Sequence, residues 1–151
     1  MVWKPHVTVA AIIEQNQRFL LVEETTSRGP AFNQPAGHLE AGESLLEAVV
    51  REVQEETAWR FEPEAFIAAQ LWRKNARSPS FLRFCFSGSA HTHNADQPLD
   101  TGIIQTHWLS HADIIARRQQ LRSPLVLKSI DQYLSGRRYP LSLIESLLDI
   151  T

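Results

Sequence analysis

Three glutamates with helical spacing are the residues of this sequence whose types and positions point most directly to chemistry. Glu52, Glu55 and Glu56 stand at i, i+3 and i+4, which on a helix lie within a sector about 100° wide. Carboxylates so close repel one another and raise one another's pKa unless a cation lies between them. Clustered carboxylate oxygens also suit a hard divalent cation such as Mg²⁺. The spacing therefore indicates a metal site on one face of a helix.

The helix that carries these acids is expected to begin after Ser44, because Ser44 and Glu47 form a Ser-x-x-Glu capping box. Glu56 projects onto the edge of the apolar stripe of this helix, at about 60° from its centre. A solvated charge would lie opposite the stripe. We therefore predict that Glu56 faces the protein. The stripe consists of Leu45, Leu46, Val49, Val50 and Val53.

Seven positions here match a known motif: Gly37, Glu43, Arg51, Glu52, Val53, Glu55 and Glu56. Their pattern resembles the Nudix box, Gly-x5-Glu-x7-Arg-Glu-(aliphatic)-x-Glu-Glu-x-Gly-(aliphatic). One position departs, because Ala58 stands where the family has glycine at the end of the helix. The resemblance implies the Nudix α/β/α sandwich, with a mixed β-sheet and the box as loop-helix-loop. The order of strands and helices alone supports only an α/β or α+β fold.

The resemblance implies that Glu52, Glu55 and Glu56 hold Mg²⁺, or Mn²⁺, against the diphosphate of a substrate. Hydrolysis of a phosphoanhydride builds charge on the transferred and leaving oxygens, which a metal stabilises. One acid must also orient or deprotonate the attacking water. We favour Glu55 or Glu56 for that role. Asp100 stays open as an alternative base or a further metal ligand, because relatives often carry two acids in its region and the second place here is Gly102. The alternative for Asp100 is an ordinary loop or turn acid.

Residues of the box loop are expected to support these acids. By resemblance, Arg51 pairs with Glu43 and fixes the loop onto the helix, in the service of catalysis. Glu40 is either an outer metal ligand or an ordinary loop acid. Gly37 relieves backbone crowding and could offer backbone groups to the metal or to a phosphate.

The organic end of the substrate has candidate ligands on a pair of strands. Trp72 and Phe81 could stack on a ring, and Arg83 could grip a phosphate with two donors. The alternative for the two aromatic residues is packing in the core, which is the commoner role of aromatic residues in strands.

Similarity beyond the box covers segments 5–10, 33–40, 81–84, 121–126 and 138–141. These segments resemble bacterial phosphatases of the Nudix family that release phosphate from nucleoside tri- and diphosphates and from hydroxymethylpyrimidine diphosphate, the thiamine precursor. We therefore expect this activity. The alternatives are another Nudix pyrophosphohydrolase, acting on a dinucleotide or an oxidised nucleotide, and a non-catalytic Nudix ligand sensor. An intact set of three repelling carboxylates disfavours the sensor.

The composition suits one globular domain over residues 1–151, since the chain is 43% hydrophobic and 21% charged. A net charge of −2 excludes the basic footprint of a protein that binds nucleic-acid polymers. No apolar run approaches 18 residues, so no membrane span is expected. No signal peptide is expected, and the lone Cys85 fits a reducing compartment. These features indicate a cytoplasmic protein. The resemblance implies a nucleotide or pyrimidine diphosphate as its small-molecule partner, and we expect a monomer or weak dimer.

Periodicity places strands at 7–13, 18–23, 65–73, 81–86 and 103–109. The first should be buried on both faces. In the fourth, Arg83 and Cys85 should face away from Leu82, Phe84 and Phe86. Further helices are expected near Ser110 and at 123–135 and 141–148, and loops at 25–30 and 91–100.

Overall fold

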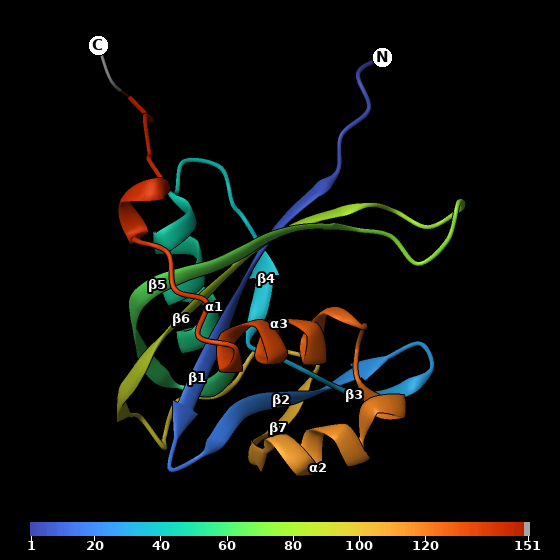
Figure 1. Cartoon of the computed structure of the whole chain (residues 1–151), viewed down its shortest axis with the longest axis vertical. Coiled ribbons are helices and arrows are strands. Elements are labelled where there is room, and N and C mark those ends of the chain that lie inside the picture. The colour runs from blue at the N-terminus through green and yellow to red at the C-terminus, as the bar shows by residue number, and fades with distance from the viewer. Residues whose placement is uncertain (150–151) are drawn as a thin grey trace.

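Strand β1 organises a seven-stranded mixed sheet (Figure 1). The computed structural model describes residues 1–149. The sheet has the order β3-β2-β1-β6-β5, with β4 also paired to β1 and β7 to β2. The β1–β6 pair is parallel and the other pairs are antiparallel. The strands are β1 (His6–Gln15), β2 (Arg18–Thr26), β3 (Gly29–Asn33), β4 (Ala36–His38), β5 (Trp59–Trp72), β6 (Phe81–His93) and β7 (Ile103–Ser110).

Helices cover both faces of this sheet. Helix α1 (Leu45–Thr57) lies on one face, and α2 (His111–Ala116) and α3 (Leu125–Leu134) lie on the other (Figure 1). Successive residues of β1 enter two separate cores, because side chains of a strand alternate between faces. Val9, Ala11 and Ile13 pack with α1, and Ala10 and Ile12 pack with α2 and α3. The predicted burial of this strand on both faces and the α/β/α fold class are thus confirmed.

Helix α1 begins and ends where the sequence predicts. The Ser44 side chain accepts from the Glu47 N–H at 3.0 Å, and the Glu47 carboxylate accepts from the Ser44 N–H at 3.0 Å. At the other end, Ala58 takes the left-handed conformation with φ 61° and donates its N–H to the Gln54 carbonyl at 3.0 Å. The helix therefore ends as it would with glycine, at a steric cost of about 1–2 kcal/mol.

Several boundaries differ from the sequence predictions because pairing between distant strands decides them. The β5–β6 pair continues to Trp59 and His93, so residues 91–93 are strand and not loop. Residues 25–30 form a β2–β3 hairpin, with Thr26 paired to Gly29. Strand β7, α2 with its Ser110 cap, and α3 confirm the predictions for those regions.

The helix predicted at 141–148 is wrong. This region contains one 3₁₀ turn, Leu141–Leu143, after which Ile144 is extended. Leu147 and Leu148 are exposed. A short helix without a packed face is not stable alone. Over residues 1–149, no helix combines the length and apolarity needed to cross a bilayer.

The capping box gives a prediction about stability. Ser44→Ala should lower the free energy of unfolding by about 1 kcal/mol, because it removes the side-chain acceptor at the start of α1. Urea unfolding followed by circular dichroism measures the change. Ser27→Ala is the control, since Ser27 is exposed in the turn between β2 and β3 and its loss should have little effect. Equal stability of the two variants would contradict the role of the cap.

Candidate active site

Three carboxylates meet where α1 approaches the segment before β7. Oxygens of Glu52, Glu55 and Asp100 all lie within 4.8 Å of one another. Asp100 is fixed there because its N–H donates to the Glu55 carbonyl at 3.0 Å, while its own carbonyl accepts from the Ile103 N–H. Sequence reasoning offered Asp100 as a candidate base or further metal ligand, with an ordinary loop acid as the alternative. The structure places it beside two of the predicted metal ligands.

Glu56 lies next to this cluster and is buried, as predicted from its place at the edge of the apolar stripe. Its carboxylate accepts from the Ala36 N–H of β4 at 2.8 Å. Burial raises the pKa of Glu56 to about 9, and the neighbouring carboxylate of Glu52 acts in the same direction. Burial also raises the pKa of Glu52. Both acids therefore lie in surroundings that disfavour negative charge until a cation compensates it.

Gly37 brings the backbone of β4 against the acids. A Cβ atom at this position would lie 2.1 Å from the carboxylate carbon of Glu52 and 2.2 Å from its Oε1 atom. Any other residue would thus displace the Glu52 side chain. Three clustered carboxylates beside an accessible backbone make an all-oxygen donor set, which fits a hard divalent cation such as Mg²⁺ or Mn²⁺.

Arg51 forms the predicted pair with Glu43. Its Nε and Nη2 atoms donate to the two Glu43 oxygens at 3.0 and 2.7 Å, and its guanidinium lowers the pKa of Glu43. The Nη1 atom also donates to Glu52 at 2.8 Å and to Glu55 at 3.1 Å. Glu40 remains at the rim, with an exposed carboxylate 3.7 Å from Arg51. Arg51 therefore links the loop before α1 to the acid cluster.

Arg83 is buried in the sheet, 5% exposed, and not open at the surface of the hairpin. Its guanidinium donates to Gln34 at 2.6 Å, Ser129 at 3.1 Å and Asn33 at 3.4 Å. All three partners are neutral. Because burial disfavours the charged form, the pKa of Arg83 is lowered. Its role in substrate binding stays a prediction.

Phe81 and Trp72 are half-buried neighbours at the ends of β6 and β5, with ring centroids 6.3 Å apart. The His6 ring stacks on Phe81 at 5.1 Å, and His6 also contacts His38. Sequence reasoning missed both histidines as part of this group. Alternation within β1 and β4 gives the face of the sheet on which each histidine lies. That alternation places the histidines beside Phe81 only once it is known which strands pair.

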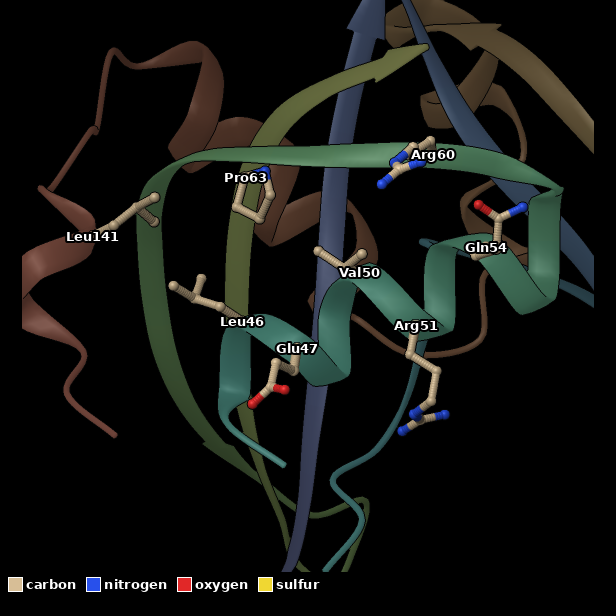
Figure 2. Close-up of a pocket in the computed structure, with 8 residues that line it drawn as sticks. All are labelled: Leu46, Glu47, Val50, Arg51, Gln54, Arg60, Pro63 and Leu141. Carbon is tan, nitrogen blue, oxygen red and sulfur yellow. The ribbon is translucent and has the colours of Figure 1, made fainter. Parts of the chain in front are cut away.

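An open pocket lies elsewhere, between α1, the first part of β5 and Leu141 (Figure 2). Of the predicted site residues only Arg51 lines it, and Figure 2 shows the Arg51 side chain directed away from Pro63 and Leu141. The acid cluster does not open into this pocket. Its lining residues are Leu46, Glu47, Val50, Arg51, Gln54, Arg60, Pro63 and Leu141.

Comparison with known proteins agrees with this geometry. The family model for the NUDIX domain matches residues 4–128. Phosphatase NudJ of Escherichia coli K12 is 46% identical over 142 residues, which are 94% of this chain and 92% of that protein. NudJ of Shigella sonnei matches to the same extent.

Solved structures show the same fold. A NUDIX hydrolase from Nitrosomonas europaea has a TM-score of 0.92 and 44% identity, covering 95% of this chain and 97% of that one. The NUDIX domain of Shewanella oneidensis NrtR, solved with ADP ribose, has a TM-score of 0.72 and 20% identity, covering 89% and 90%. The second likeness concerns the fold alone.

The raised pKa of Glu56 predicts how stability without metal depends on pH. The pKa is about 9 in the folded protein and about 4.3 in an unfolded chain. Protonated Glu56 therefore contributes stability that is complete below the unfolded pKa and is lost as the pH rises toward 9. In EDTA, the wild type should lose stability relative to Glu56→Gln between pH 5 and 8, by up to about 1.4 kcal/mol per pH unit.

Urea unfolding at several pH values measures this difference. Glu62→Gln, at an exposed position, should follow the wild type at every pH. Parallel curves for the wild type and Glu56→Gln would show that the pKa of Glu56 is ordinary.

Proposed function

Because this chain belongs to the Nudix family of hydrolases, we propose that it is a Mg²⁺-dependent phosphatase of nucleoside tri- and diphosphates and of hydroxymethylpyrimidine diphosphate. The observation that carries the metal dependence is the meeting of Glu52, Glu55 and Asp100 beside Gly37. The similarity to proteins named phosphatase NudJ favours release of orthophosphate. Mn²⁺ is the alternative metal.

We assign the metal to the carboxylates of Glu52, Glu55 and Asp100, with Glu56 beside them. When bound, Mg²⁺ would neutralise charge that develops on the phosphate oxygens during hydrolysis. Arg51 holds Glu52 and Glu55 in place through hydrogen bonds of 2.8 and 3.1 Å. Each carboxylate thus keeps its position without reorganisation during the reaction.

Glu55 is our choice for deprotonating the attacking water. Its side chain is 40% exposed, against 10% for Glu52. Glu56 is buried and its carboxylate already accepts from Ala36, so its access to water is poorer. A general base must lie within hydrogen-bond reach of the water that it activates.

We also propose that the chain forms one Nudix domain that acts in the cytoplasm as a monomer or weak dimer on a small-molecule diphosphate. The two cores share β1 and its neighbours, which supports a single folding unit. Size-exclusion chromatography with light scattering at two protein concentrations tests the oligomeric state.

A product assay tests the proposed reaction. The protein should release orthophosphate from nucleoside triphosphates, nucleoside diphosphates and hydroxymethylpyrimidine diphosphate in Mg²⁺, and release none in EDTA. Ion chromatography separates orthophosphate from pyrophosphate and mononucleotides. Pyrophosphate or paired mononucleotides as the products would favour the other pyrophosphohydrolase. Binding of these ligands without turnover would instead support the alternative that the protein is a non-catalytic ligand sensor.

Substitutions that each remove one carboxylate charge test the catalytic roles of Glu55 and Glu56. Glu55→Gln and Glu56→Gln should each lower kcat at least about 100-fold, because each removes a carboxylate from the metal and base machinery. Steady-state phosphate release measures the rates. Glu62→Gln, outside the cluster, should keep the wild-type rate. Near-normal rates in both variants would contradict the assignment of the metal ligands and the general base to α1.

A further inference from the structure

Four side chains form an aromatic–histidine platform at the end of β1, β4, β5 and β6: His6, His38, Trp72 and Phe81. His6 pairs with Phe81, and Phe81 with Trp72, so the three are cross-strand neighbours in one row. The His6 and Phe81 rings are stacked, with centroids 5.1 Å apart and an angle of 26°. His38 lies opposite Thr8, which is two residues from His6. All four side chains therefore project from the same face of the sheet.

Two ring nitrogens of the platform pair with each other, and the other two have no hydrogen-bond partner in the described chain. His6 Nδ1 and His38 Nε2 lie 3.1 Å apart, so one ring donates its N–H to the other. This contact and the stacking on Phe81 fix the orientation of His6. His6 Nε2 and His38 Nδ1 have no hydrogen-bond partner within residues 1–149. The platform thus offers a flat ring face and two polar atoms at exposed side chains.

Strand β4 joins the platform to the acid cluster. His38 directly follows Gly37, whose Cα lies against the Glu52 carboxylate, and the His38 carbonyl accepts from Arg51 Nη2 at 3.0 Å. A diphosphate held by Glu52 and a ring bound beside His38 would therefore lie on the two sides of this three-residue strand, which pairs with β1 along one edge.

A buried positive charge lies on the same sheet face. Arg83 is two residues from Phe81 along β6, so both side chains project to one side. Its hydrogen-bond partners are amide and hydroxyl oxygens, and no carboxylate lies within 4.0 Å of it in the described chain. A buried charge without a counter-ion is costly, and an anionic ligand nearby would offset this cost. The sheet face that carries the platform is therefore favourable for a ligand that bears both a ring and negative charge.

We propose that the aromatic–histidine platform is a specificity subsite that stacks the planar nitrogen heterocycle of the substrate. It rests on the proposed function, because the diphosphate of the same substrate must lie at the acid cluster. Every nucleobase and pyrimidine has a face that can stack on Phe81 and His6. The remaining ring nitrogens of the exposed His6 and His38 can exchange hydrogen bonds with polar atoms on the edge of the ring. An alkyl diphosphate offers neither contact.

The test compares two substrates in the full-length protein. His6→Ala should raise KM for cytidine diphosphate about 5- to 100-fold, with little change in kcat and no change in KM for a straight-chain alkyl diphosphate. His91→Ala is the matched control, because His91 is an exposed histidine near the opposite end of β6. It should leave both KM values unchanged. Thermal unfolding of each variant verifies that it is folded.

A second measurement does not depend on turnover. Cytidine monophosphate titrated into the protein in EDTA should quench tryptophan fluorescence, and the quenching should disappear in His6→Ala. Trp72→Phe should retain binding, measured by calorimetry, while losing that signal.

The outcomes separate the two proposals. Equal increases in KM for both diphosphates, or no preference of the wild type for the heterocyclic substrate, would overturn the subsite. Absence of quenching together with normal hydrolysis would also overturn it, while leaving the proposed function intact. Hydrolysis of neither substrate, with quenching by cytidine monophosphate that depends on His6, would refute the phosphatase and support the subsite.

Discussion

The guanidinium of Arg51 is the interaction on which the site depends. It donates to both oxygens of Glu43 and to one oxygen each of Glu52 and Glu55. Since like charges so close repel, Arg51 is what allows the acids to share one corner of the fold. One positive charge cannot balance all of them. The remaining negative charge is a local destabilisation that a bound cation would relieve, which is what the proposed metal site requires.

Local sequence information was sufficient to predict α1. The Ser44–Glu47 box fixed its start, and the position of Glu56 beside the apolar stripe indicated that this acid is buried. These features depend on residues within a few positions of one another, where helix geometry sets the neighbours. Asp100 could not be placed with the same certainty. Its position follows from contact with α1 across more than 40 residues, which periodicity does not encode.

Long-range pairing also explains what the sequence did not predict. The alternation in β6 gave the correct face for Arg83, but its partners Gln34 and Ser129 come from distant segments. The His6–Phe81 stack depends on the parallel register of β1 and β6, and such a register is visible only after folding. The pattern at 141–148 favoured a helix, but Leu141 and Ile144 pack against the core from a 3₁₀ turn and an extended residue while Leu147 and Leu148 stay exposed. Tertiary contacts thus overrode propensity.

Strand β4 has a larger role than its three residues suggest. Ala36 donates its N–H to Glu56, Gly37 lies against Glu52, and the His38 carbonyl accepts from Arg51. The successive residues thus contact the side chains that prepare the metal site, while the His38 ring faces the other way. Pairing with β1 fixes this short strand on one edge. If the reacting phosphate lies at the acid cluster and a ring lies beside His38, as proposed, the two would be held at a fixed separation, because a paired strand cannot stretch. The backbone of β4 would then select substrates by the length between phosphate and ring, and the side chains would select the ring.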